Sequence, residues 1–390
     1  MFHADPSFMN ILFYSSNFKP MDGGVAEHTH QYVKYFHDRS HSVTVVAPEV
    51  EESQSFDEEQ PYDIYRIRRW PRPIGYGFFF IFLVKLLYKE EIDVVYCPVW
   101  YPLGLYAALL RPLTSIRLVI AVHGWEVEHG WGSFVQPFQV QSAVLQRPVF
   151  RTADAVVAVS EWTRERVLSN VSNRVDVYVV NNGVLPEQFE CAETLEMVDG
   201  VDISHRRVLL TVARLVPRKG HDTVIRALPG ILEEHPDTVY LVAGDGPRRS
   251  ELESLSESVG VEDNVVFLGY VPESDLPDLY NTADLFVMPN RREGTSVEGF
   301  GIVFLEANAA GTPVIGGNHG GVPDAIVDDV TGRLIDPYSP EEFAATTIEL
   351  LDTPEAAVEM GQQGLERVRS EFTWNHSGAE LEEIFRRLSQ

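Results

Sequence analysis

The stretch that decides the fold reads Glu298-Gly-Phe-Gly-Ile-Val-Phe-Leu-Glu306, followed by Ala-Asn-Ala-Ala-Gly-Thr-Pro-Val-Ile. Two glycines, Gly299 and Gly301, permit a tight loop between the glutamates. A short helix is expected to begin at about Ile302 and to end at Gly311, and a strand is expected over Pro313–Ile315. The stretch therefore predicts a loop, a helix and a strand in succession, as in an α/β domain.

The two glutamates flank the start of this predicted helix. Glu298 lies in the loop before the helix, and Glu306 lies about one turn into it. The free backbone N–H groups between them, together with the positive end of the helix dipole, suit a phosphate. A sugar joined to a nucleotide through pyrophosphate needs amides for phosphate and carboxylates for the hydroxyls of the sugar and the ribose.

Short apolar runs rich in β-branched residues recur along the chain with helical stretches between them. In the first half they are Ile11–Tyr14, Val43–Ala47, Val94–Cys97, Leu118–Val122, Ala155–Val159 and Val177–Val180. In the second half they are Val208–Val212, Val239–Ala243, Val265–Leu268, Leu285–Met288 and Pro313–Ile315. Continuous apolar runs indicate strands buried on both faces, and strand–helix alternation indicates parallel sheets. Two such series predict two Rossmann-like domains.

The predicted domain boundaries follow from changes in this pattern. An acidic, weakly periodic stretch, 186–206, is expected to be a linker between a first domain, 1–185, and a second domain, 207–371. The tail, 372–390, has the pattern of an amphipathic helix. Its pattern alone leaves open whether it packs on the second domain or returns to the first.

Bulk composition limits the partners of the chain. Its 390 residues, 44% of them hydrophobic, suffice for two cores. The formal net charge of −27 argues against nucleic acid as a partner. The first residues do not resemble a signal peptide, and the longest apolar run of note, Phe78–Val84, is far too short to span a bilayer. The expected location is the cytoplasm.

The Glu298–Glu306 segment resembles the Glu-x7-Glu motif of retaining, GT-B-fold glycosyltransferases of the GT4 type. The resemblance implies two Rossmann-like domains facing a central cleft, with a C-terminal helix that crosses back to the first domain. It also implies that Glu298 acts on the hydroxyls of the transferred sugar and that Glu306 holds the ribose. The implied phosphate-binding amides are those of Phe300, Gly301, Ile302 and Val303.

Three further segments resemble elements of the same family. The first, Ala213-Arg214-Leu-Val-Pro-Arg-Lys219-Gly220, implies that Arg214 and Lys219 bind the diphosphate, while Arg218 is interpreted as a surface residue. The second is the Gly23-Gly24 loop, implied to lie near the donor phosphate. The third is His123, at the end of a predicted strand and implied to contact the transferred sugar.

No metal site or cofactor is expected. The chain contains no Asp-x-Asp, the pair that holds a divalent cation in the other large glycosyltransferase fold. The charge of the leaving group would then be met by basic side chains and the helix N-terminus.

The segment 66–88 bears on the acceptor. Four arginines, Arg66, Arg68, Arg69 and Arg72, precede an aromatic helical stretch, Phe78–Tyr88. This pattern fits either a buried helix beside a surface loop, which we favour, or peripheral contact with anionic lipid at the inner face of the cell membrane.

The sequence thus predicts a retaining hexosyltransferase that moves sugar from a GDP- or UDP-sugar to a hydroxyl of a glycan, lipid-linked or small-molecule acceptor. Alternatives are a non-hydrolysing sugar-nucleotide epimerase and a non-catalytic protein that binds sugar nucleotides. Neither the base, the sugar, the acceptor nor the oligomeric state can be read from the sequence.

Overall fold

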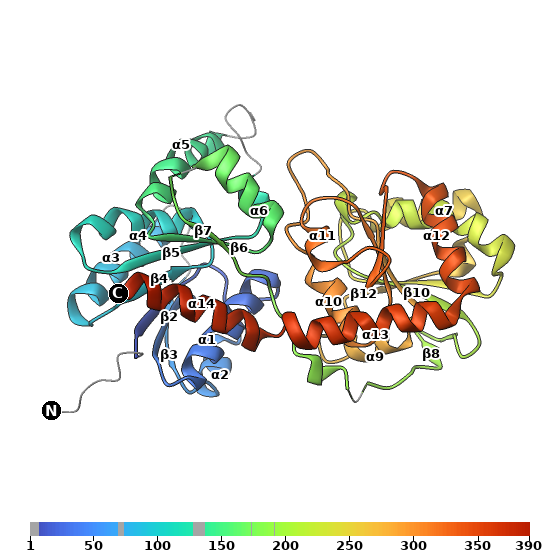
Figure 1. Ribbon diagram of the computed structural model, residues 1–390, viewed down its shortest axis with the longest axis horizontal. Coiled ribbons are helices and arrows are strands. Elements are labelled where there is room, and N and C mark those ends of the chain that lie inside the picture. The colour runs from blue at the N-terminus through green and yellow to red at the C-terminus, as the bar shows by residue number, and fades with distance from the viewer. Residues whose placement is uncertain (1–7, 69–73, 128–136, 173, 191) are drawn as a thin grey trace. The chain divides into compact units, whose positions relative to one another are not determined.

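A computed structural model describes residues 8–68, 74–127, 137–172, 174–190 and 192–390 (Figure 1). The chain divides into two compact units. The first comprises Met1–Asn182 together with Trp374–Gln390, and the second comprises Gly183–Thr373. Each unit is built on one parallel sheet with helices between successive strands, which is the Rossmann-like arrangement predicted from the two series of apolar runs.

The first unit contains a seven-stranded sheet in the order β3-β2-β1-β4-β5-β6-β7. Its strands are β1 Asn10–Tyr14, β2 Ser42–Pro48, β3 Asp63–Ile67, β4 Val94–Cys97, β5 Arg117–Val122, β6 Ala155–Ala158 and β7 Val177–Val179. Its helices are α1 Gly24–Asp38, α2 Ser53–Glu58, α3 Ile74–Lys89, α4 Leu105–Leu110, α5 Pro137–Thr152, α6 Glu161–Arg166 and α14 Trp374–Ser389. Strands β4 and β6 are buried along their whole length, because helices cover both faces of a parallel sheet.

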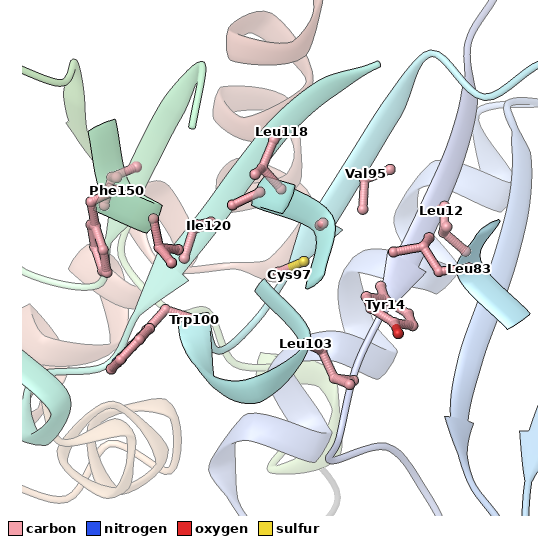
Figure 2. Close-up of a cluster of buried hydrophobic side chains, with 14 of the residues drawn as sticks. Leu12, Tyr14, Leu83, Val95, Cys97, Trp100, Leu103, Leu118, Ile120 and Phe150 are labelled. Carbon is pink, nitrogen blue, oxygen red and sulfur yellow. The ribbon is translucent and has the colours of Figure 1, made fainter. Parts of the chain in front are cut away.

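The core of this unit lies between the sheet and the helices α3, α4 and α5. Figure 2 shows side chains of β1, β4 and β5 pointing into it, among them Leu12, Cys97 and Ile120. Leu83 of α3 is also fully buried there. Close packing of this kind holds the carboxyl ends of the strands, where β1 and β5 lead into the predicted Gly-Gly loop and His123, in fixed register.

The C-terminal helix α14 belongs to the first unit and packs on α1. The rings of Phe36 and Phe385 stack with their centroids 5.1 Å apart, and the Tyr35 hydroxyl donates to Glu382 at 2.9 Å. The amphipathic tail thus returns to the first unit after the chain has built the second, as the predicted crossing helix requires.

The second unit contains a six-stranded sheet in the order β12-β11-β10-β13-β14-β15 and a hairpin of β8 with β9. Its strands are β8 Met197–Val198, β9 Val201–Asp202, β10 Arg207–Val212, β11 Thr238–Ala243, β12 Val265–Gly269, β13 Leu285–Met288, β14 Val314–Gly317 and β15 Gly332–Ile335. Its helices are α7 His221–Glu234, α8 Arg249–Val259, α9 Leu276–Thr282, α10 Ile302–Ala309, α11 Val322–Ala325, α12 Pro340–Asp352 and α13 Pro354–Glu371. The first helical residue of α10 is Ile302, as the sequence predicts.

Two strands of the parallel sheets were not predicted, β3 and β15, and both lie at sheet edges; the short hairpin strands β8 and β9 were not predicted either. Both edge strands contain charged residues, Asp63 and Arg66 in β3 and Arg333 in β15, so they lack the continuous apolar run that marked the others. The stretch 186–206 packs on α9, since the main-chain N–H of Leu195 donates to Thr282 Oγ1 at 2.9 Å. Its function as a linker, and the domain boundaries drawn from it, stay predictions.

Within the part of the chain that the structure describes, no helix combines the length and apolar character needed to cross a membrane.

Candidate nucleotide-sugar site

The predicted site residues of the second unit lie in the segments that follow the carboxyl ends of β10 and β13. Successive connections leave β10 in opposite directions, first to β11 and later to β13, so the sheet has its switch point between β10 and β13. Ligands of open α/β sheets bind at such points. Lys219 follows β10 and Glu298 follows β13, which places both residues at the switch point.

Glu298 is the centre of a polar cluster. Its Oε2 accepts hydrogen bonds from Lys219 Nζ at 2.6 Å and from Asn290 Nδ2 at 3.1 Å, and it also pairs with the guanidinium of Arg218. The interpretation of Arg218 as a surface residue is therefore wrong. The 3₁₀ turn Pro217–Lys219 directs both of its last two side chains toward the same carboxylate.

The cluster fixes the charge of Glu298. Burial by itself would raise the pKa of the carboxyl, but Lys219 and then Arg218 outweigh it and lower the pKa to about 2. The pKa of Lys219 is lowered, because burial of its ammonium exceeds the attraction of Glu298. Because its pKa is lowered, Glu298 stays ionised at neutral pH, and its Oε2 accepts the hydrogen bonds from Lys219, Asn290 and Arg218. Among the described residues, its Oε1 has no hydrogen-bond partner.

The loop after β14 holds Glu298 from the other side. The main-chain N–H of Gly321 donates to the Glu298 carbonyl at 3.0 Å. Gly320 has a φ of +65°, and a Cβ there would lie 2.4 Å from the same carbonyl oxygen. Only glycine allows this approach, so the loop 318–321 fixes the main chain on which the carboxylate is carried.

Helix α10 begins directly after this loop. Gly301, with a φ of +100°, precedes its first residue, and the N–H groups of Ile302 and Val303 have no acceptor within the helix. Phe300 is 2% exposed and its ring lies 5.9 Å from that of Phe372, so it anchors the loop to the body of the unit.

Glu306 lies one turn further along α10. Its Oε2 accepts from the Tyr280 hydroxyl at 2.6 Å. Tyr280 is buried, and burial followed by the charge of Glu306 raises its pKa well above the usual value. Glu306 also acts electrostatically on Lys219, so the structure brings both predicted glutamates and the predicted lysine into one neighbourhood.

Arg214 stands apart from this cluster. It follows β10 at the same sheet edge, but its side chain is exposed and makes no hydrogen bond or ion pair with any residue that the structure describes. Its predicted contact with diphosphate stays a prediction.

Sequence reasoning missed Asn290 and Tyr280. Asn290 is 1% exposed and follows β13 after one proline, so a polar residue at the end of a buried strand was the available signal. Tyr280 lies on α9, 26 residues before its partner, and its sequence offers no such signal.

The predicted residues of the first unit follow β1 and β5. Gly23, with a φ of +120°, precedes α1. Both Gly23 and Gly24 are exposed, and a Cβ added at either position would have no other atom within 4 Å. The first N–H groups of α1 are therefore open to a ligand. The switch point of this sheet lies between β1 and β4.

His123 ends β5, and its ring is constrained. Its Nε2 lies 2.8 Å from the carbonyl oxygen of Pro98, which can only accept, so Nε2 carries the proton. Burial lowers the pKa of the ring to about 4, so it is neutral at pH 7. Nδ1 is then unprotonated, and His123 presents a hydrogen-bond acceptor rather than a donor.

Among the described residues, no three His, Cys, Asp or Glu side chains form a group that could hold a metal ion.

The fold and this cluster define a GT-B protein of the sugar-nucleotide class. Residues 22–188 match the family described as Glycosyltransferase Family 4, and residues 199–367 match Glycosyl transferases group 1. The chain belongs to glycosyltransferase family 4. It is accordingly a retaining hexosyltransferase that moves sugar from a nucleotide-diphospho-sugar to a hydroxyl acceptor.

Two relatives agree with this assignment, and a solved structure shares the fold. The chain is 33% identical over 383 residues to the GDP-mannose-dependent alpha-(1-6)-phosphatidylinositol monomannoside mannosyltransferase of Mycobacterium tuberculosis, covering 96% of this chain and 98% of the relative. It is 34% identical over 187 residues to a D-inositol 3-phosphate glycosyltransferase of Corynebacterium glutamicum, covering 46% and 43% of the two chains. Sucrose-phosphate synthase from Thermosynechococcus elongatus has the same fold, with a TM-score of 0.80, 21% identity and coverage of 97% and 99%.

Proposed function

We propose that the protein transfers mannose from GDP-mannose to a hydroxyl of an inositol phosphate headgroup carried by a membrane lipid. The observation that carries the donor half of this proposal is the Glu298 cluster, an ionised carboxylate with one oxygen engaged and the other without a partner in the described part of the chain. The choice of mannose and of the lipid rests on the full-length similarity to a GDP-mannose-dependent phosphatidylinositol mannoside mannosyltransferase.

The donor site would use each member of the cluster differently. Glu298 Oε1 accepts hydrogen bonds from hydroxyls of the transferred sugar, and Glu306 accepts from the ribose. The N–H groups at the start of α10 bind phosphate, with Lys219 and Arg214 supplying positive charge. That charge stabilises the diphosphate as the bond from the anomeric carbon to its phosphate oxygen breaks.

The transfer step keeps the configuration of the sugar. The acceptor hydroxyl attacks the anomeric carbon from the side on which the diphosphate leaves, and the leaving phosphate oxygen takes the hydroxyl proton. His123, as a neutral acceptor, receives a hydrogen bond from a sugar hydroxyl through Nδ1.

Contact with lipid is assigned to the outer face of α3. Phe79, Leu83 and Leu86 of this helix are buried. The opposite face carries exposed apolar side chains at helical spacing, with exposed fractions of 64% for Ile81 and 91% for Tyr88. Lys85 and Lys89 are exposed beside them, and apolar residues flanked by lysine suit an anionic bilayer surface.

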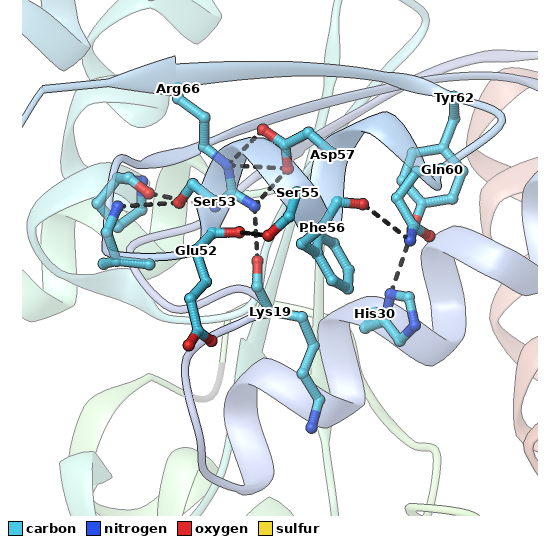
Figure 3. A network of polar contacts seen from close by, with 12 residues as sticks. Lys19, His30, Glu52, Ser53, Ser55, Phe56, Asp57, Gln60, Tyr62 and Arg66 are labelled. Atoms are coloured by element: carbon cyan, nitrogen blue, oxygen red, sulfur yellow. Dashed lines mark hydrogen bonds and ion pairs between the residues drawn. The ribbon is translucent and has the colours of Figure 1, made fainter.

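Arg66, one of the four arginines of the segment 66–88, is not assigned to lipid contact. Arg66 bonds with Asp57 and with the main-chain oxygen of Lys19 at 2.6 Å, as Figure 3 shows. Its side chain is only 10% exposed, so its charge is already neutralised within the unit. Arg69 and Arg72 lie outside the described residues, and the lipid contact is therefore ascribed to α3.

The donor is tested by thermal shift with GDP, UDP, ADP and their sugars on the wild type and on Glu306→Ala. We expect GDP and GDP-mannose to raise Tm and the variant to lose most of the shift. A shift with UDP compounds alone would reject GDP-mannose. No shift with any of them would reject the donor site.

The acceptor is tested with GDP-mannose and either phosphatidylinositol mannoside vesicles or free inositol phosphate. Mannosylated lipid supports the proposal, whereas product from the soluble acceptor alone would reject the lipid. Donor incubated without acceptor tests the epimerase alternative by the appearance of an epimer.

The membrane contact is tested by co-sedimentation with phosphatidylinositol vesicles. Ile81→Glu is expected to weaken binding, whereas Val358→Glu, at an equally exposed apolar residue of α13 in the other unit, leaves it unchanged. Equal binding by both variants would refute the role of α3.

A further inference from the structure

Glu126 is a buried carboxyl group that the proposed mechanism does not use. It lies in the 3₁₀ turn Trp125–Val127, directly after His123 and Gly124. Only 6% of the residue is exposed. Its Oε1 accepts the main-chain N–H of His123 at 2.5 Å, and its own carbonyl oxygen accepts from Gln146 Nε2 at 2.8 Å. The side chain thus folds back onto the end of β5.

This contact replaces a sheet hydrogen bond. The strand β5 ends at Val122, so the N–H of His123 lies beyond the described ladder and takes a carboxylate as its acceptor. The arrangement is costly, since Glu126 Oε2 is buried and has no hydrogen-bond partner among the residues that the structure describes. Burial accordingly raises the pKa of Glu126 to about 7. A residue that served only to satisfy one N–H could do so with a smaller, uncharged side chain.

The same contact completes a clamp around His123. The ring is held at Nε2 by the Pro98 carbonyl, and it packs against the ring of His28 in an edge-to-face arrangement with centroids 4.8 Å apart. His28 is itself fixed, because Asn182 Oδ1 and the Tyr96 hydroxyl occupy its two nitrogens at 2.8 and 2.7 Å. Glu126 is the member of this clamp that holds the main chain of His123, through the N–H of that residue.

We propose that Glu126 is a positioning residue for glycosyl transfer, which holds the main chain of His123 and thereby aims the ring acceptor Nδ1 at the sugar. The inference rests on the proposed contact of His123 with the transferred sugar. It does not depend on which nucleotide or acceptor the enzyme uses.

The kinetic test compares Glu126→Ala with Glu126→Gln in the full-length protein. The Gln side chain keeps an oxygen that can accept the His123 N–H, whereas Ala removes it. We expect Ala to lower kcat by about 10- to 100-fold with little change in donor KM, and Gln to stay within about threefold of the wild type. A kcat near wild type for Ala, or an equal loss for Gln, would overturn the proposal.

A matched control separates positioning from general destabilisation. Asp93 also accepts a main-chain N–H through its carboxylate, that of Asn10 at 2.7 Å, at the other end of the same sheet. Asp93→Ala should lower Tm without lowering kcat. A parallel loss of kcat in this control would show that the effect of Glu126→Ala is merely structural.

Hydrogen exchange tests the contact without any assay of activity. The His123 amide should exchange faster in Glu126→Ala than in the wild type, and Glu126→Gln should restore its protection. Unchanged exchange would refute the contact. If the wild type transfers no sugar to any acceptor, the proposed function fails, while the exchange result still decides whether Glu126 holds His123.

Discussion

Replacing Glu298 by Gln removes the one negative charge that Lys219 and Arg218 share, and we expect it to destabilise the second unit. The change keeps the size of the side chain and one oxygen that can accept from Asn290. What it removes is the charge that compensates the burial of Lys219, of which 8% is exposed.

The magnitude follows from the pKa of Glu298. A fall from the ordinary 4.5 to about 2 corresponds to about 3 kcal/mol in favour of the folded state at neutral pH. Burial of Lys219, whose pKa is lowered, offsets part of this. We therefore expect a loss of about 2–3 kcal/mol, within the range seen when one partner of a buried pair is removed. In a unit of this size that is a fall in Tm of about 5–10 °C.

The assay is thermal unfolding of the wild type and of Glu298→Gln as a function of pH. Because the folded pKa lies below the ordinary value, the ionised carboxylate stabilises the fold fully above pH 4.5, and this contribution is lost as pH falls toward 2. The difference in Tm between the two proteins should stay constant from about pH 5 to 8 and shrink below that range. Glu359→Gln, at an exposed glutamate of α13, serves as the control.

Two results would refute this reasoning. One is a Tm of the variant within about 1 °C of the wild type at pH 7, since loss of the pairing with Lys219 and Arg218 requires a larger fall. The other is a difference that grows rather than shrinks as the solution becomes more acidic. The variant should still bind GDP but lose the additional shift given by GDP-mannose over GDP, because Glu298 is assigned to the sugar.

Three further predictions concern other parts of the structure. Tyr280→Phe removes the hydroxyl that donates to Glu306 at 2.6 Å, and calorimetry should show GDP affinity reduced by about fivefold, less than for loss of the glutamate itself. Gly301→Ala should lower Tm and weaken GDP binding, since φ is +100° and the new Cβ would lie 2.7 Å from Phe304; unchanged Tm would contradict this strain. Cys97 is fully buried and burial raises its pKa, so mass spectrometry after thiol alkylation should find it modified only when the protein is unfolded.

The fold was largely predictable because its strongest signals are local. A strand buried on both faces needs an unbroken apolar run, and such runs marked β4 and β13 within the chain. The edge strands β3 and β15 contain charged residues, so no apolar run marked them, whereas the edge strands β7 and β12 contain none and were predicted. The pairing register and the strand order leave no mark on the composition of an edge strand. They are therefore seen only in the folded sheet.

The charged residues show where local reading fails. Arg218 and Lys219 are neighbours of like charge, and nothing in their spacing distinguishes a surface residue from one that faces a carboxylate 80 positions away. Arg66 belongs to an arginine-rich run, yet Asp57 and the Lys19 carbonyl neutralise it. An ion pair depends on the positions of two loops in space, which sequence spacing does not encode.

The sequence by itself determined the class of the protein, because the spacing of Glu298 and Glu306 around two glycines is a property of one loop and one helix. The tertiary structure decided which oxygen of Glu298 is engaged, that Tyr280 and Asn290 support the two carboxylates, and that His123 is neutral and protonated at Nε2. These properties depend on burial and on atoms brought together from separate strands, and both arise only when the sheet is assembled.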